Sequence, residues 1–327
     1  MQLSVERMAR ARCGRRWVGG KGGRRERRRT GDARGVRSQG IGAQEWEVDF
    51  CSRPLKDERG KRVWEVLVTD PNRSFEFSEY LPNSRINSGE LARSIQRAAD
   101  SSGAELPKRA KFFRPQMQTI ISRALGEAGV QPAPSRRCFT LMSWLQERKE
   151  HVYPNEHGYD PSLPPPAGFD PKAPERLPDS LRGESWNFVA LSLSEVLEEC
   201  AAVRDGSRFG ALIDVDSLNL NVSSDTLIPG VCVYTRRSKA LAGWMSSLEL
   251  ANVAINLQYG QLLLETGVSD VWQYATYKAN EANTEQAQAW LQAKEEACGL
   301  HFLAVQPSEE SEAADGFWLC RDFEPSV

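Results

Sequence analysis

The sequence predicts an α+β protein with two mixed α/β domains that a proline-rich linker joins. Segments in which apolar and polar residues alternate, as in half-buried strands, are interspersed with segments whose apolar residues recur at helical spacing. Eight prolines lie between Pro154 and Pro178, a density that no helix or central strand tolerates. The 327 residues suit two domains. We expect a basic segment over 1–45, a first domain over 46–153, a linker over 154–184 and a second domain over 185–327.

The first domain is expected to follow the order β-β-β-α-β-α-β. Apolar and polar residues alternate from Trp46 to Phe50, which predicts a strand. The predicted elements are strands over 46–50, 63–69 and 75–80, a helix that Ser88 caps and that ends near Gly103, a strand over 108–113, a helix from Pro115 to Gly129, and a strand over 136–142 that runs into a short helix. This is the order of elements in the ribonuclease-H-like fold.

The second domain begins after the linker with an ordered segment from Trp186 to Leu193. Ser192 and Glu195 form the pattern of a capping box, in which two side chains satisfy free N–H groups at a helix start. The further predicted elements are strands over 209–215 and 230–235, a helix from Ser238, an antiparallel meander over 250–257, 261–265 and 271–277, a helix over 284–298, and strands over 300–305 and 317–321.

One stretch, residues 107–153, is positively charged in an otherwise acidic body. It contains nine Lys and Arg residues against three Glu residues, a net charge of +6, whereas the remainder of 46–327 has a net charge of −17. Aromatic residues are interleaved with these cations. Because rings stack on bases and cations hold phosphates, the combination is typical of proteins that bind single-stranded RNA.

The stretch therefore predicts a site for single-stranded RNA. The residues expected to contact RNA are Lys111, Phe112, Phe113, Arg114, Arg123, Arg136, Arg137, Trp144 and Arg148. This interpretation requires the cations to form one exposed surface and at least some rings to face outward. A solvated rim of charges around core aromatics is the structural alternative. A protein-binding assembly factor, whose positive surface meets acidic partners, is the functional alternative.

The order of elements also suggests a third possibility, a metal-dependent nuclease. Such an enzyme needs several carboxylates that converge on metal ions, and Asp49 and Glu90 lie in suitable places. The end of the fourth strand, where another carboxylate is required, has Arg114 instead, and a cation would repel the metals. We therefore expect no catalytic residues and no enzymatic activity. The strand carboxylates are expected on a solvated face, and they are Glu47, Asp49, Glu65, Asp70, Glu76 and Glu79.

Cysteine and histidine patterns give no sign of a metal site or a cofactor. The seven cysteines lie far apart without a CxxC pair, which favours reduced thiols over a zinc ribbon or a disulfide scaffold. The three histidines form no HExxH motif. No run of 18 apolar residues occurs, so the sequence predicts no membrane span.

The N-terminal segment, residues 1–45, is the most basic part of the chain. It contains 13 Lys and Arg residues against four acidic residues, a net charge of +9, and shows no apolar periodicity. This composition predicts disorder. The segment suits either an organelle transit peptide, which is rich in Arg and poor in acidic residues, or a basic arm that adds unspecific affinity for nucleic acid. The transit peptide is the favoured interpretation.

Longer motifs are distributed from Trp46 to Cys320. They are 46–54 (WEVDFCSRP), 61–70 (KRVWEVLVTD), 85–88 (RINS), 112–119 (FFRPQMQT), 134–137 (PSRR), 144–148 (WLQER), 152–154 (VYP), 181–184 (LRGE) and 302–307 (FLAVQP). In these segments the chain resembles the Tab-two-like family of plants, algae and cyanobacteria. The resemblance covers nearly all of the chain after the basic segment.

The resemblance implies a non-enzymatic RNA-binding protein of the chloroplast stroma. Such a protein binds the 5′ leader of a photosystem reaction-centre mRNA and activates its translation, with other translation factors as further partners in a larger complex. The message is that of photosystem I, the B subunit in the founding member, and in some relatives of photosystem II. The alternative within this setting is a protein-binding factor of photosystem assembly.

The family also has a C-terminal Trp-Leu-Leu tripeptide that is tied to RNA binding. The matching residues here are Trp318, Leu319 and Cys320, so the resemblance adds Trp318 and Leu319 to the RNA-binding residues. The cysteine and the seven residues after it depart from the family pattern. Inward-facing residues of an edge strand would give the same sequence pattern.

Overall fold

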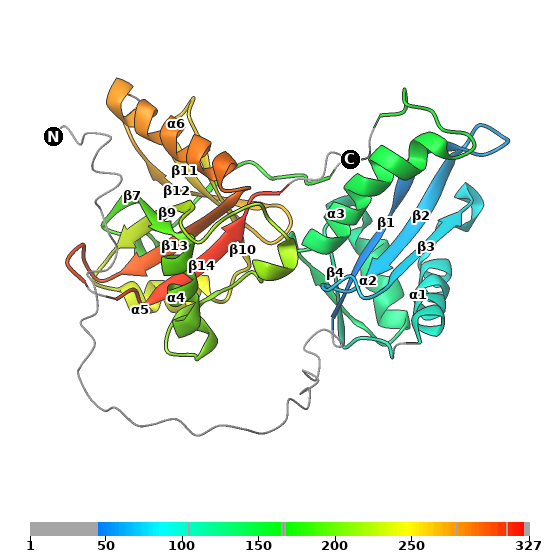
Figure 1. The fold of residues 1–327 in the computed structure, drawn as a ribbon, viewed down its shortest axis with the longest axis horizontal. Helices are drawn as coiled ribbons and strands as arrows, with labels where there is room; N and C mark the ends of the chain where they lie inside the picture. The colour runs from blue at the N-terminus through cyan, green and yellow to red at the C-terminus, as the bar shows by residue number, and fades with distance from the viewer. Residues whose placement is uncertain are drawn as a thin grey trace, which may run out of the picture.

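The chain contains helices and strands in several mixed sheets, which confirms the α+β class. The computed structural model describes residues 45–103, 105–164, 166, 168–278, 280–311 and 313–323, so nearly all of the expected transit peptide or arm lies outside the described residues. Figure 1 shows two bodies side by side. We call residues 45–153 the N-terminal unit and residues 185–323 the C-terminal unit.

The N-terminal unit is built on a five-stranded sheet with the order β3-β2-β1-β4-β5. β2 pairs antiparallel with β1 and β3, whereas β1, β4 and β5 are parallel. The elements are β1 (Glu45–Lys56), β2 (Arg62–Thr69), β3 (Glu76–Leu81), α1 (Ser88–Ser102), β4 (Arg109–Phe112), α2 (Gln118–Glu127), β5 (Gln131–Pro134) and α3 (Phe139–Glu147). Along the chain they give the order β-β-β-α-β-α-β-α.

Local sequence explains most of these boundaries. Alternate residues of β1, including Val48 and Phe50, pack into a core that α1 and α2 close. Asn87 rather than Ser88 caps α1, because its side chain accepts a hydrogen bond from the N–H of Glu90 at 2.9 Å. Gly103 ends α1 in the left-handed conformation, with φ at 65°.

The prediction of the last strand was wrong. The strand is Gln131–Pro134, and most of the segment expected as a strand belongs to α3. The apolar residues of this short segment fit both the two-residue period of a strand and the 3.6-residue period of a helix. Packing against the sheet selects the helix. β5 lies at the edge of its sheet, which is why it accommodates two prolines that cannot donate to a neighbouring strand.

The expected solvated face of the sheet is also a wrong prediction. α3 covers this face (Figure 1). Glu47, Asp49 and Glu65 retain 3%, 1% and 0% of their exposure, and Asp70 is also buried, whereas Glu76 is exposed and Glu79 half-buried. The alternation is that of a strand buried on both sides, with carboxylates rather than apolar residues on one side.

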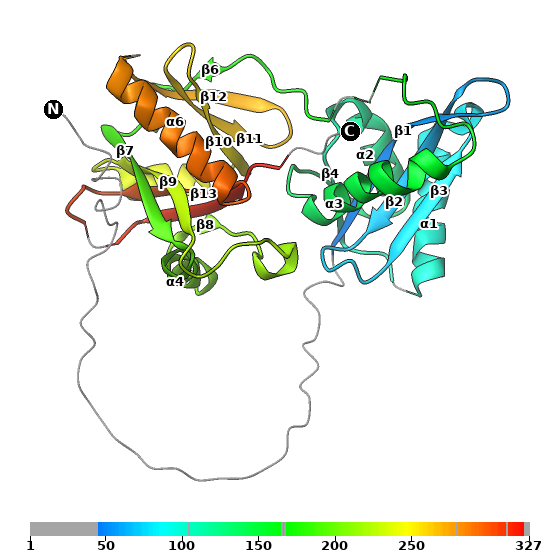
Figure 2. The same ribbon diagram turned by 45° about the horizontal axis from the view of Figure 1, so that its top comes forward.

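The C-terminal unit contains a five-stranded sheet of order β7-β9-β13-β14-β8 and a four-stranded sheet of order β10-β11-β12-β6. Its elements are β7 (Ser185–Ser192), α4 (Leu193–Arg204), β8 (Phe209–Ala211), β9 (Leu227–Tyr234), α5 (Ser238–Met245), β10 (Leu250–Asn256), β11 (Gln261–Thr266), β12 (Asp270–Thr276), α6 (Glu281–Glu296), β13 (Leu300–Gln306) and β14 (Gly316–Arg321), and the proline-rich segment contributes β6 (Glu175–Arg176) to the smaller sheet. The capping box at Ser192 is present as predicted. α4 covers one face of the five-stranded sheet, and the opposite face packs against α5, α6 and the smaller sheet (Figure 2).

The proline-rich segment is more than an extended connector. Its β6 pairs with β12, Tyr159 forms a bridge with Leu55, and Leu177 is buried. The segment therefore adds to both units while joining them. No helix in the described ranges is long and apolar enough to cross a membrane.

Candidate nucleic-acid interface

The aromatic residues predicted to stack on RNA bases lie in the interior. Phe112 and Phe113 retain 1% and 0% of their exposure, and Trp144 retains 4%. Phe112 belongs to the core under α1 and α2, whereas Phe113 belongs to the core on the opposite side of the sheet. Both sides of the strand are covered, so neither ring offers a face to a base in this conformation.

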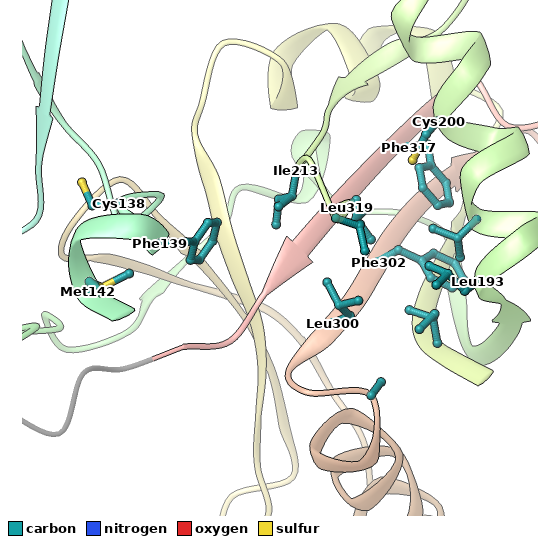
Figure 3. Packing of buried hydrophobic residues seen from close by; sticks show 14 of the residues in the cluster. Cys138, Phe139, Met142, Leu193, Cys200, Ile213, Leu300, Phe302, Phe317 and Leu319 are labelled. Carbon is teal, nitrogen blue, oxygen red and sulfur yellow. The ribbon is translucent and has the colours of Figure 1, made fainter. Parts of the chain in front are cut away.

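Trp318 and Leu319 are likewise fully buried. They lie on β14, which is an inner strand between β13 and β8 rather than an edge strand. Leu319 packs toward α4, as Figure 3 shows from close by, and Trp318 packs on the opposite face of the sheet. Neither side chain can contact RNA directly. Trp318 and Leu319 could affect RNA binding only by positioning the residues that follow them.

Arg114, expected to contact a phosphate, is locked to a carboxylate instead. Its Nε lies 2.6 Å from Oδ1 of Asp49, and Arg53 Nη2 lies 2.8 Å from Oδ2 of the same carboxylate. Burial alone would raise the pKa of Asp49, but the charges of the two guanidinium groups and their hydrogen bonds hold it below its usual value. Arg114 thus lies beside Asp49 where a metal-dependent nuclease would need a second carboxylate.

Arg148 joins the same buried network through Glu65. Glu65 accepts hydrogen bonds from Arg53 Nε at 2.7 Å and from the hydroxyl of Tyr153 at 2.6 Å, and its other oxygen pairs with Arg148. The guanidinium of Arg148 lies 5.6 Å from the centre of the Trp144 ring. We call Asp49, Arg53, Glu65, Arg114 and Arg148 the buried ionic cluster. Among the described residues no group of His, Cys, Asp and Glu is arranged to hold a metal ion.

Glu47 has a separate structural role on the same face. Its carboxylate accepts the N–H of Leu141 at 2.7 Å, in the first turn of α3, so a strand carboxylate supplies the cap that this helix lacks locally. Burial raises the pKa of Glu47 to about 7, although the hydrogen bond and the charge of Lys111 act in the opposite direction. The cap fixes α3 over the sheet.

Arg136 and Arg137 hold the two units together. Arg136 pairs with Glu265 and donates from Nε to the carbonyl of Val268 at 3.2 Å. Arg137 donates to the carbonyls of Leu212 and Leu250 at 3.2 and 2.8 Å. Ser135 adds a hydrogen bond to Glu249 at 2.5 Å. Three consecutive residues of the N-terminal unit thus contact the C-terminal unit.

The remaining predicted cations lie on different faces. Arg123 is on α2, 74% exposed and paired with Glu127, whereas Lys111 points to the α3 side and pairs with Glu45. The cations of the basic stretch are therefore divided among two sheet faces, a buried cluster and an interface between units. The expected single cationic surface is not formed.

The junction between the units contains a cavity of about 340 Å³. Arg136 belongs to its wall, with Phe169 from the proline-rich segment, Glu265 from β11 and Lys294 from α6. The last residue of β14 and the two residues after it complete the wall, and they are Arg321, Asp322 and Phe323. We call this the junction cavity. Its size falls within the range of about 300–1,000 Å³ that is usual for ligand sites.

The junction cavity combines flat rings with an excess of positive charge. Arg136 lies 4.5 Å from the centre of the Phe169 ring, and Arg321 lies 4.5 Å from that of Phe323. The wall has three cations against two carboxylates. Lys294 pairs with Asp322, but Arg321 has no carboxylate partner among the described residues, and its one hydrogen bond there, from Nε to the carbonyl of Cys298, is 3.4 Å long.

Sequence reasoning identified Arg136 but missed the rest of this cavity. Phe169, Lys294 and Arg321 are far apart in the chain, and only tertiary packing brings them together. The local signal was Arg321-Asp-Phe323, which directly follows the Trp318-Leu-Cys320 segment and carries a cation next to a ring.

Comparison with solved structures gives only weak matches. Among solved structures, the HTLV-2 integrase catalytic core domain in complex with magnesium matches with a TM-score of 0.23 and 11% identity, over 36% of this chain and 78% of that chain. The simian T-cell lymphotropic virus intasome in complex with PP2A regulatory subunit B56 gamma matches with a TM-score of 0.23 and 13% identity, over 52% of this chain and 68% of that chain. At these TM-scores the likeness supports no conclusion about fold or activity.

Comparison of sequences gives relatives of much higher identity. "Protein TAB2 homolog, chloroplastic" of Zea mays is 43% identical over 282 residues, 86% of this chain and 72% of the relative. The protein of the same name from Arabidopsis thaliana is 43% identical over 282 residues, 86% of this chain and 75% of the relative. The family model "RNA-binding protein Tab2/Atab2 N terminal" matches residues 45–148, and "RNA-binding protein Tab2/Atab2, C-terminal domain" matches residues 164–321. The chain therefore belongs to the Tab2/Atab2 family of RNA-binding proteins.

Proposed function

We propose that this protein binds RNA in the chloroplast stroma and activates translation of a photosystem reaction-centre mRNA, that of photosystem I and in some settings of photosystem II. The observation that carries the proposal is membership of the Tab2/Atab2 family across both matched regions, together with 43% identity to two relatives whose names include "chloroplastic". The RNA partner is the single-stranded 5′ leader of the message, with other translation factors as further partners. The protein acts as a binding factor and not as an enzyme.

The junction between the units is the part of the surface that best suits RNA. Arg137 and Arg321 lie there without a carboxylate partner among the described residues. Because neither charge is neutralised by a neighbouring carboxylate, both guanidinium groups attract phosphates more strongly than the paired cations do. Lys111, on the α3 side of the sheet, contributes less because Glu45 neutralises its charge.

The other predicted residues contribute in different ways. Most of them are buried or held in the buried ionic cluster and support the fold that presents the junction, and they are Phe112, Phe113, Arg114, Trp144, Arg148, Trp318 and Leu319. Arg123 lies on α2, on the other face of the N-terminal sheet, and adds only long-range attraction that salt screens.

Binding to leader RNA tests the proposal directly. Purified protein should retain the 5′ leader of a photosystem mRNA on a filter more tightly than an unrelated RNA of equal length, with an affinity that falls steeply as salt rises. The variant Arg321→Gln, which loses only one hydrogen bond of 3.4 Å, should bind more weakly while its circular dichroism spectrum is unchanged. Absence of affinity for either RNA would overturn the proposal and favour a protein-binding assembly factor.

Ribosome profiling of a knockout identifies the message. We expect ribosome occupancy to fall on one photosystem reaction-centre mRNA while its abundance changes less. Unchanged occupancy on all such messages would contradict the role in translation, even if the protein binds RNA.

A further inference from the structure

We propose that the junction cavity holds one unpaired nucleotide of the bound RNA, and that its base carries an exocyclic amino group. The inference rests on the proposed function and adds the place and the chemistry of one contact. Three features of the cavity support it: its rings, a guanidinium group that no carboxylate of the described residues neutralises, and its carboxylate.

The rings provide surfaces for a base. Phe169 and Phe323 both line the cavity and both are only partly buried, unlike the rings predicted from the sequence. Each is already stacked with a guanidinium group on one side, at 4.5 Å in both cases. The guanidinium group of Arg321 also lies 5.6 Å from the centre of the Phe139 ring, so the aromatic rings rather than the guanidinium planes are the surfaces on which a base would stack. Single-stranded RNA is bound by stacking on such rings.

Arg321 provides the phosphate contact. An arginine has five N–H donors, and here only Nε has a partner among the described residues, a carbonyl at 3.4 Å. The other donors remain available for an anion. The carboxylate of Asp322, which is 48% exposed, pairs with the buried Lys294. It therefore does not compete with a phosphate for the guanidinium group of Arg321. Arginine donors of this kind bind phosphate oxygens strongly.

Glu265 provides the contact to the base edge. Its Oε2 accepts hydrogen bonds from Arg136 and from Asn252 Nδ2, the latter at 3.1 Å. No described residue donates to its Oε1. A carboxylate accepts a hydrogen bond from the amino group of cytosine or adenine, whereas uracil offers only an oxygen at that position. The cavity should therefore favour cytosine over uracil.

Calorimetric titration of the full chain with cytidine monophosphate and uridine monophosphate tests the base preference, because the two differ only at positions 3 and 4 of the base: cytosine has an acceptor nitrogen and an amino group there, and uracil has an N–H and an oxygen. We expect cytidine monophosphate to bind and uridine monophosphate to bind about tenfold more weakly, the effect of one hydrogen bond to a charged group. Equal affinity, or no binding of either, would overturn the proposal.

Two substitutions place the nucleotide in the cavity. Phe323→Ala and Arg321→Gln should each weaken binding of cytidine monophosphate and of leader RNA about tenfold, the loss of one stacked base or one charged contact. Both side chains are partly exposed, and neither substitution leaves a buried charge without a partner. Arg236→Gln, an exposed arginine outside the cavity, is the matched control and should bind as the unaltered protein does.

The outcomes separate the cavity from the proposed function. Leader RNA bound equally by the unaltered protein and by both cavity variants would overturn the cavity assignment and leave RNA binding intact. Nucleotide binding without RNA binding would overturn the proposed function and, with it, the assignment of the cavity to RNA.

Discussion

The buried ionic cluster and the junction cavity are both rich in arginine, but they differ in how the charge is compensated. In the buried ionic cluster each arginine faces Asp49 or Glu65, and no side chain is more than 11% exposed. In the junction cavity Arg321 has no carboxylate partner among the described residues, and Asp322 reaches solvent. The difference shows that what identifies a binding surface is the positive charge left after pairing, not the density of Lys and Arg in the sequence.

The sharpest way to test this comparison is to break the buried ionic cluster. Arg114→Ala should lower the free energy of unfolding by about 3 kcal/mol, because Asp49 would retain only one of its two guanidinium partners in a buried site. Urea unfolding followed by circular dichroism measures the loss. The affinity of the folded variant for leader RNA should be unchanged, and a loss of affinity without a loss of stability would reverse the roles assigned to the two regions.

The Glu47 cap gives a pH-dependent effect of similar size. The pKa of Glu47 is about 7 in the folded protein against 4.5 for an unperturbed glutamate, so the folded state keeps a proton that the unfolded state releases between these values. The resulting stabilisation is complete below the lower pKa and is lost as the pH rises through the higher one. Relative to Glu47→Gln, the unaltered protein should lose about 3 kcal/mol between about pH 4 and about pH 8.

Urea unfolding at several pH values checks this prediction. Glutamine keeps a side-chain oxygen for the N–H of Leu141 but does not titrate in this range. Parallel stability curves for the two proteins would show that Glu47 is ionised normally in the folded state.

The salt dependence of RNA binding tests whether Arg321 in the junction cavity contacts a phosphate. Arg321→Gln should reduce the slope of log affinity against log salt by about 0.7, the value for one phosphate contact on a single strand. Filter binding to leader RNA at four or more salt concentrations gives the slope. An unchanged slope would show that Arg321 does not meet a phosphate, whatever its effect on affinity.

The smallest effect is expected at Arg123. Its pair with Glu127 is exposed, so Arg123→Ala should change the free energy of unfolding by no more than about 0.5 kcal/mol. The substitution serves as the control for Arg114→Ala in the same urea series. A loss comparable with that of Arg114→Ala would mean that burial does not govern the strength of these pairs.

The sequence predicted the elements well where local signals were strong. The capping box before α4 and the antiparallel strands β10, β11 and β12 were predicted near their observed bounds, and the start of β1 was predicted at Trp46, although the strand runs on to Lys56. The prediction was wrong at Phe139–Glu147, where a short apolar segment fits both periods and only packing against the sheet decides. The burial of Glu47 and Asp49 was missed because strand alternation does not show what covers the polar face.

The α+β class, the family and the excess of positive charge in one stretch could be predicted from the sequence, because they depend on order along the chain and on composition. Which of the described arginines are paired with a carboxylate depends instead on tertiary packing. A salt bridge such as that between Arg114 and Asp49 joins residues 65 positions apart, and the junction cavity joins segments from both units. Pairing and desolvation depend on distances in space, so the number of cations in a stretch could not show where RNA would bind.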